Sequence, residues 1–210
     1  MDLFLVQENQ NIYNLLKGCL HNDRHSQKEL YLSLRRQAYA ICYRYIDNLE
    51  QIDQILNKSF VQLFKHIDQF NRNKFPDIQK GVRSWLSSIV VGHCIDYYRQ
   101  LQVFNKTQMP AEERDHRQKE IGNTTGQPSG HDIIEAIRKL PPSNRIVFNL
   151  FVIEGMPHKE IGHQLGIRAS WSSSILNDAR EMIRKHLSGE NSLANPEEKS
   201  AFIFSTPAPD

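Results

Sequence analysis

The 210 residues carry 26 basic and 24 acidic side chains, and 39% are apolar, which is typical of a soluble globular protein with one large or two small domains. The net charge of +2 excludes the strongly basic surface of a histone-like protein but permits weaker nucleic-acid binding. No apolar run approaches the ~18 residues of a membrane-spanning helix, and the first residues lack a secretory signal. We therefore expect a cytoplasmic protein without membrane insertion.

Three helical stripes follow one another in the first hundred residues. Apolar side chains recur at steps of three and four from Leu30 to Tyr45, from Ile52 to Phe70 and from Leu86 to Leu101. No convincing stretch alternates apolar and polar side chains as a strand would. The pattern predicts an all-α bundle over about residues 10–101. Asn71–Val82, which contains a proline and a glycine, is expected to be a loop.

The helical pattern stops after this bundle and resumes thirty residues later. Residues 102–130 end in Gly, Pro, Ser and Thr, so we expect a flexible linker that leaves two domains independently folded. A second helical domain is predicted over 131–187, where Pro142 suits the first position of a helix. Residues 188–210 lack periodicity and carry an excess of acidic side chains, which predicts a disordered tail.

The strongest local signal is a pair of helices on either side of Gly166. The first, residues 157–165, is short and amphipathic, and Gly162 stands where two helices approach closely. Gly166 suits a left-handed helix end, because a residue without Cβ adopts that conformation freely. A second amphipathic helix follows, with Arg168 at its start. This is the pattern of a helix-turn-helix whose second helix enters the major groove, and an ordinary αα-hairpin is the alternative.

The second signal is the loop Asn71–Val82 together with the helix that follows it. Aromatic and cationic side chains alternate there, which suits single-stranded nucleic acid, because bases stack on rings while cations follow phosphates. Phe75 lies in a polar stretch and is hard to explain as core, whereas Trp85 alone is more typical of a core residue. The members of this group are Phe70, Arg72, Lys74, Phe75, Lys80, Arg83, Trp85, Tyr97, Tyr98 and Arg99.

Signatures of an enzyme or a metal site are absent from the sequence. His158 and His163 are five residues apart and do not share one helix face as a pair four apart would. Cys19, Cys42 and Cys94 are too far apart for a zinc ribbon, and the last two lie on apolar stripes where we expect them to be buried. We expect no catalytic residues, no metal and no cofactor.

The order of these parts resembles bacterial RNA polymerase sigma factors of the extracytoplasmic-function (ECF) group, over about residues 12–187. The resemblance is carried by QIDQILNKSFVQLFKHIDQF, RSWLSSIVVGHCIDYYRQ and LPPSNRIVFNLFVIEGMPHKEIGHQLGI. The third stretch alone also resembles LuxR-type regulators, but the first two together are more specific. The resemblance implies that residues 10–101 are similar to sigma region 2 and residues 131–187 to sigma region 4. It further implies a non-enzymatic protein for transcription regulation, active in DNA-templated transcription initiation.

The resemblance also implies partners: core RNA polymerase, through its largest-subunit clamp helices and its flap, promoter DNA, and an anti-sigma factor. The helix 51–64 would dock on the basic clamp through Asp53, Gln54, Asn57, Lys58 and Phe60. Region 2 would melt and capture the −10 element through Arg72, Lys74, Phe75, Lys80, Arg83, Trp85, His93 and Arg99. The helix 168–184 would read the −35 element, with the residues Lys159, Arg168, Ser170, Trp171, Ser172, Ser173, Ser174, Asn177, Arg180 and Arg184.

Two helices depart from the family pattern. The docking helix reads IDQILNKSF where the family is commonly acidic, and the recognition helix has a serine run followed by Asp178 where a cation is common. Two alternatives therefore stay open. One is a helix-turn-helix regulator of another class with a helical sensor, although a sensor has no use for the cationic, aromatic loop. The other is a degenerate sigma paralogue that acts as a protein-interaction module, which the altered helices favour.

Overall fold

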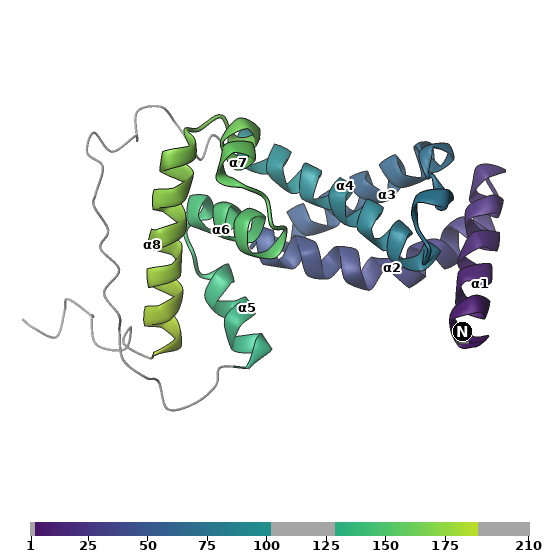
Figure 1. Cartoon of the computed structure of the whole chain (residues 1–210), viewed down its shortest axis with the longest axis horizontal. Coiled ribbons are helices and arrows are strands. Elements are labelled where there is room, and N and C mark those ends of the chain that lie inside the picture. Colours follow the sequence, from purple (N-terminus) through teal and green to yellow (C-terminus); the bar gives the residue numbers. More distant parts are fainter. Residues whose placement is uncertain (1–2, 102–128, 189–210) are drawn as a thin grey trace, which may run out of the picture.

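The computed structural model describes residues 3–101 and 129–188, and all the regular structure in these two ranges is helical (Figure 1). This confirms the predicted all-α class. The helices fall into two groups, one on each side of the gap. Nearly all of the predicted linker and tail, residues 102–130 and 188–210, lie outside the described residues. No helix in the described ranges has the length and apolar character needed to cross a membrane.

The first group contains α1 (Leu3–Leu20), α2 (Arg24–Tyr45), α3 (Leu49–Lys65) and α4 (Ile78–Gln100). A capping side chain fixes the start of each of α2, α3 and α4 by accepting a hydrogen bond from a backbone N–H of the first turn. The three pairs are Asp23 with the Ser26 N–H at 2.9 Å, Asn48 with the Gln51 N–H at 3.1 Å, and Asp77 with the Lys80 N–H at 3.0 Å. α3 ends at Lys65, before the end of the predicted stripe. The next residues form two 3-10 turns, η1 (Ile67–Gln69) and η2 (Arg72–Lys74).

The apolar stripes of α2, α3 and α4 meet in one core. Leu34, Ile52 and Leu86 are at most 1% exposed, so each predicted stripe supplies a fully buried side chain. Cys42 and Cys94 are also fully buried, as predicted. A hydrogen bond to the neighbouring Cys42 and burial raise the pKa of the Cys94 thiol well above its usual range, so Cys94 acts as a small neutral core residue.

The second group contains α5 (Gly130–Arg138), α6 (Pro142–Phe148), α7 (His158–Leu165) and α8 (Ala169–Leu187). A capping box between Ser129 and Asp132 starts α5, and a proline occupies the first position of α6 as predicted. α6 continues into a π-helical segment, η4 (Asn149–Ile153), in which the Glu154 N–H donates to the Asn149 carbonyl five residues back at 3.0 Å.

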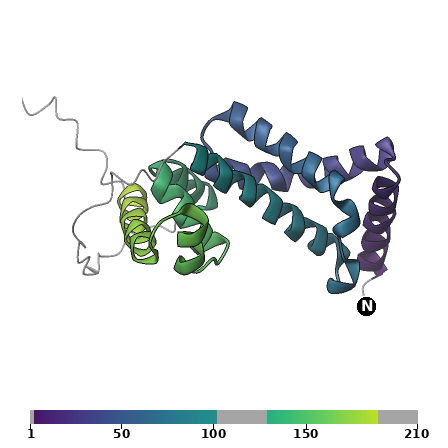
Figure 2. The ribbon, with the colours of Figure 1, turned by 90° about the horizontal axis from the view of Figure 1, so that it is seen from above.

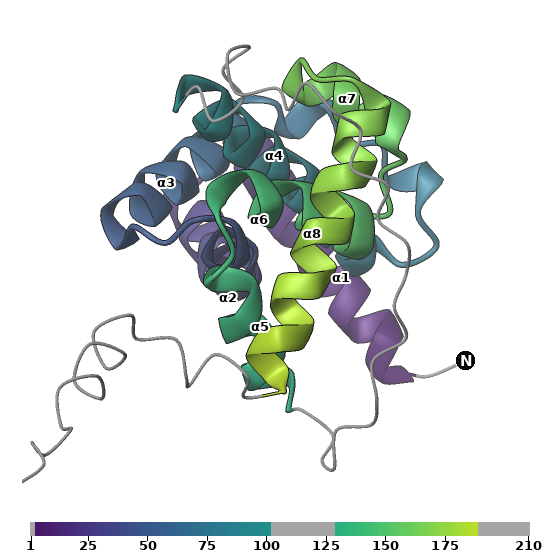
Figure 3. The same ribbon diagram turned by 90° about the vertical axis from the view of Figure 1, so that its left-hand side faces the viewer.

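The two groups pack against each other. Figures 1 and 2 show α1 at one end of the molecule and α8 at the other, while α6 and α7 lie beside the C-terminal part of α4. Figure 3, seen from the second group, shows α5, α6 and α8 in front of the bundle. One continuous apolar cluster runs through both groups. We expected independent domains, and the described residues instead form a closed arrangement with a shared interface.

Candidate nucleic-acid interface

The turn between α7 and α8 has the geometry of a helix-turn-helix. Gly166 has φ +70° and ends α7 in the left-handed conformation, and the Ile167 N–H donates to the Gly162 carbonyl at 2.9 Å. A Cβ at Gly162 would lie 2.7 Å from the Ile167 carbonyl oxygen, so the close approach of the two helices requires glycine there. The structural roles predicted for both glycines are confirmed.

One face of α8 is available to a duplex. Ile175, Leu176 and Ala179 are buried on the inner face of α8. The exposed positions carry three arginines and two polar side chains, and Lys159 is exposed on α7. These positions are Arg168, Ser170, Asn177, Arg180 and Arg184, with Trp171, Ser173 and Ser174 half-buried beside them. The structure thus brings most of the predicted recognition residues together on one surface.

The prediction that Ser172 contacts DNA is wrong. Its side chain is fully buried, and its Oγ lies 3.0 Å from Nδ1 of His158 on α7. The His158 ring stacks on Phe151 with centroids 4.3 Å apart. Burial, helped by the nearby Arg180 charge, lowers the pKa of His158, which favours a neutral ring. Ser172 and His158 therefore connect the two helices from inside and do not face DNA.

The loop between α3 and α4 places its aromatic side chain against α4. The Phe75 ring is half-buried and lies parallel to Phe70, with centroids 5.7 Å apart and an interplanar angle of 3°. Phe70 in turn contacts Trp85 at 5.7 Å. A Cβ at Gly81 would lie 2.5 Å from the Phe75 ring, so the ring can pack there only because residue 81 has no side chain. Phe75 is therefore part of an aromatic cluster rather than a free ring in a polar loop.

We expect Phe75→Ala to lower the free energy of unfolding by about 1–3 kcal/mol, because the change removes a half-buried ring and its aromatic contact. Chemical denaturation measures this, and Phe75→Leu, which keeps apolar volume, should retain most of the stability. An unchanged free energy for the alanine variant would contradict the packing role. A variant that loses stability but opens promoter DNA normally would exclude the ring from base capture.

A hollow of about 260 Å³ lies between α3 and α4. Trp85 and His93, both predicted site residues, line it together with Gln62 and Asp96, which sequence reasoning missed. Burial lowers the pKa of His93, and its Nε2 atom is buried without a hydrogen-bond partner among the described residues. A Cβ at Gly92 would meet nothing within 4 Å, so the hollow is open at that point. It combines an aromatic face with polar groups, as a nucleobase site requires.

The basic residues predicted to bind the −10 element lie near the two ends of α4. Lys74, Lys80 and Arg83 are exposed near its beginning, and the structure does not describe the side chain of Arg72. Arg99 lies at the far end, about 35 Å away for a helix of this length. There its Nε donates to the Gln164 carbonyl on α7 at 2.6 Å. In this arrangement Arg99 contacts the second domain, and its role in strand capture stays a prediction.

The outer face of α3 is the third predicted surface. Asp53, Gln54, Asn57 and Lys58 are all exposed on it, as the proposed docking role requires. Val61, which sequence reasoning missed, is 67% exposed one turn further along. The docking role predicted for Phe60 is wrong, because its side chain is only 3% exposed and packs on Tyr31, with ring centroids 4.6 Å apart. Phe60 therefore belongs to the buried face of α3.

These features define a helical DNA-binding protein with a helix-turn-helix in one domain and an aromatic, cationic helix pair in the other. The family model for Sigma-70 region 2 matches residues 30–103, and that for Sigma-70 region 4 matches residues 131–182. The chain therefore belongs to the sigma-70 family, within its ECF group.

Two relatives show the extent of the similarity. The chain is 24% identical over 160 residues to the ECF RNA polymerase sigma factor SigE of Mycolicibacterium smegmatis, a match that covers 74% of this chain and 59% of that protein. It is 27% identical over 167 residues to the ECF RNA polymerase sigma factor SigW of Bacillus subtilis, covering 71% of this chain and 82% of that protein. The first match thus spans less than two thirds of the relative's length.

Proposed function

We propose that this protein is a sigma factor that binds core RNA polymerase and directs promoter-specific transcription initiation in the cytoplasm, without catalytic activity of its own. The observation that carries the proposal is the pairing of two family regions in one chain, each with its expected surface exposed. The serine-rich α8 still presents Arg168, Arg180 and Arg184 to solvent. The exposed polar face of α3 supports the same function.

Each surface has a role in this proposal. The exposed face of α3 docks on the clamp helices of the largest polymerase subunit, and the second domain contacts the flap. The hollow beside Trp85 and the loop cations Lys74 and Lys80 hold the melted strand of the −10 element. The outer face of α8 contacts the −35 element, with base contacts from serine hydroxyls and Asn177 and phosphate contacts from arginines. An anti-sigma factor remains a proposed partner.

Reconstitution with core RNA polymerase tests this function. We expect a stable complex and transcripts that depend on a promoter selected by the complex from a random library. Absence of any complex with core would overturn the proposal. A complex that forms but never initiates would instead favour the protein-interaction module, for which the altered recognition helix is the motivating observation.

The salt dependence of DNA binding tests the α8 surface. We expect Arg168→Ala to make the slope of log affinity against log salt shallower by about 0.9, because one phosphate contact is lost. The titration uses the full-length protein and a DNA duplex of any sequence, since phosphate contacts do not depend on base sequence. Arg35→Ala, an exposed arginine on α2, is the matched control and should leave the slope unchanged. An unaltered slope in Arg168→Ala would remove this residue from the interface.

A further inference from the structure

One arginine on the outer face of α8 lies over an aromatic ring from outside the helix-turn-helix. Asn177, Arg180 and Arg184 follow one another at steps of three and four residues, so they lie on one stripe of α8. The guanidinium carbon of Arg180 lies over the Phe151 ring, 5.9 Å from its centroid. A ring face attracts a cation at up to about 6 Å. Phe151 belongs to η4, so the ring reaches α8 from the segment that precedes α7.

The Phe151 ring is itself held from α7. The His158 ring stacks on it with centroids 4.3 Å apart and an interplanar angle of 18°. On its other side His158 is fixed to α8, because its Nδ1 atom lies 3.0 Å from Oγ of the fully buried Ser172. Contacts therefore run from the buried side of α8 through two stacked rings to an exposed arginine of the same helix. We call this set the Phe151 stack: Phe151, His158, Ser172 and Arg180.

The Phe151 stack holds Arg180 without neutralising it. Lys185, one turn further along α8, pairs with the carboxylate of Glu181 at 2.8 Å. No carboxylate of the described residues forms such a pair with Arg180. An aromatic ring attracts a guanidinium through its quadrupole and leaves the positive charge in place, whereas a carboxylate would cancel it. A phosphate can therefore bind this arginine without displacing an anion that is already there.

Holding an arginine in place before it binds favours the bound state. A free arginine side chain samples many rotamers, and a phosphate contact orders it at a cost in affinity of about two- to tenfold. A side chain that is already ordered loses less freedom on binding. The lowered pKa of His158 is consistent with this role, since burial and the nearby Arg180 charge favour a neutral ring that does not repel the guanidinium.

We propose that Phe151 is a positioning residue of the DNA-binding surface. Its ring, fixed by His158, holds Arg180 in the orientation in which the guanidinium meets a backbone phosphate of the duplex. Phe151 acts through Arg180 and does not touch DNA itself. The inference rests on the proposed sigma-factor function and deepens it, because it makes a residue outside the helix-turn-helix contribute to the affinity of α8 for DNA.

A double-mutant cycle on the full-length protein tests the proposal. Phe151→Leu removes the ring but keeps apolar volume, Arg180→Ala removes the cation, and the double variant removes both. Affinity is measured on a duplex of any sequence at one salt concentration, since phosphate contacts do not depend on base sequence. Phe151→Tyr keeps a ring. Phe148→Leu makes the matched substitution at a side chain of α6 that is 9% exposed, and circular dichroism verifies that every variant is folded.

The cycle has a defined expected result. Phe151→Leu should bind DNA about two- to tenfold more weakly than wild type, and Phe151→Tyr should bind as wild type does. The double variant should bind no more weakly than Arg180→Ala alone, because two residues that act through one contact do not give additive losses. Phe148→Leu should lower stability and leave DNA affinity unchanged, which separates positioning from packing.

Nuclear magnetic resonance of the free protein gives a second readout that does not involve DNA. Protons over the face of an aromatic ring resonate upfield of their usual positions. We expect the side-chain protons of Arg180 to lie upfield of those of Arg184, one turn further along the same stripe. Phe151→Leu should remove this difference, and Phe151→Tyr should preserve it.

Three outcomes would overturn the inference. Unchanged Arg180 resonances in Phe151→Leu would mean that the ring does not hold this arginine. Additive losses in the cycle would mean that Phe151 affects DNA binding by another route, and equal losses in Phe151→Leu and Phe148→Leu would mean that packing alone is responsible. If the wild-type protein binds no DNA, the proposed function fails and the positioning role fails with it. The resonances would still decide whether the ring orders Arg180, so the two failures are distinguishable.

Discussion

Replacing Asp53 with arginine is expected to weaken binding to core RNA polymerase by at least about tenfold. Asp53 is exposed on the outer face of α3, and among the residues proposed to dock on a basic clamp it is the one with negative charge. A reversed charge at a desolvated interface pair costs on the order of 2–5 kcal/mol, and less at a wet rim. Tenfold corresponds to about 1.4 kcal/mol, which lies just below the range for a desolvated pair.

Two further variants separate a specific contact from a general charge effect. Asp68→Arg, at an exposed position in the 3-10 turn after α3, makes the same change in net charge and should leave core affinity unaltered. Val61→Asp, which places a charge on an exposed apolar side chain of the same face, should weaken binding as Asp53→Arg does. Equal affinity of wild type and Asp53→Arg in a titration with core polymerase would exclude this face of α3 as the docking surface.

Gly162→Ala is expected to lower both the stability of the protein and its affinity for DNA. The added Cβ would lie 2.7 Å from the Ile167 carbonyl oxygen and 3.3 Å from the Ala169 nitrogen, both backbone atoms of the turn. Backbone in a tight turn moves less easily than a side chain, so we expect a loss of about 1–3 kcal/mol. For a chain of this size that lowers the melting temperature by roughly 2–4 °C per kcal/mol. DNA binding should fall as well, because α7 and α8 are forced apart.

Gly92→Ala is the matched control for this substitution. Gly92 also lies within a helix, but a Cβ there meets nothing within 4 Å. Alanine at that position should raise stability by about 0.5–1 kcal/mol, since glycine is disfavoured in helix interiors. Calorimetry on both variants compares the two contexts. If Gly162→Ala melted at or above the wild-type temperature, the close approach of α7 and α8 would not depend on glycine.

Local features of the fold could be predicted because their causes are local. The stripes ending at Tyr45 and beginning at Leu86, the proline at the start of α6 and the left-handed Gly166 each depend on residues a few positions apart. The surface roles that the family resemblance implied misplaced Ser172 and Phe60, which are both buried. Ser172 is polar, and its partner His158 comes from the preceding helix, so residue type alone indicated a surface position.

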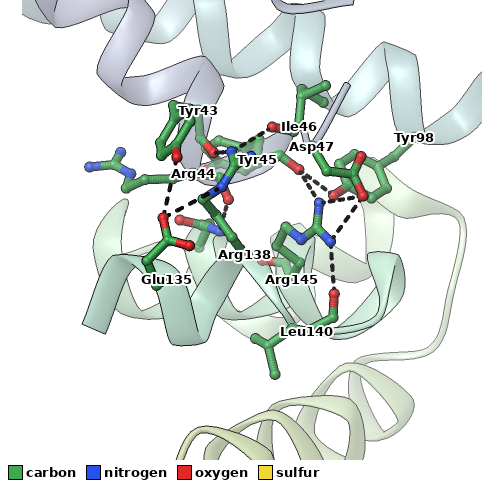
Figure 4. Close-up of polar contacts among 11 residues, drawn as sticks. Tyr43, Arg44, Tyr45, Ile46, Asp47, Tyr98, Glu135, Arg138, Leu140 and Arg145 are labelled. Atoms are coloured by element: carbon green, nitrogen blue, oxygen red, sulfur yellow. Dashed lines mark hydrogen bonds and ion pairs between the residues drawn. The ribbon is translucent and has the colours of Figure 1, made fainter. Parts of the chain in front are cut away.

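The contacts that the second domain makes with the C-terminal end of α2, drawn in Figure 4, could not be predicted for a different reason. Arg138 and Arg145 have the sequence context of ordinary surface cations on amphipathic helices. Their main acceptors are backbone carbonyls 92 to 100 residues away, and every residue supplies such an acceptor whatever its side chain. The hollow beside Trp85 is similar, because Gln62 and Asp96 meet there only after α3 and α4 have packed. Contacts of this kind depend on how the helices are arranged in space.

The π-helical segment makes the second domain tolerant of losing one residue where a regular helix would not be. A π turn accommodates one residue more than an α turn, so deleting one residue from η4 would allow α6 to continue as a regular helix. The side chains beyond the deletion would keep nearly the same direction, because the wider turn had already absorbed the extra residue. Glu154 would still face Arg44, with which it pairs at 3.2 Å. The same loss near the start of α8, a regular helix, would rotate Arg180 and Arg184 by about 100° around the helix axis.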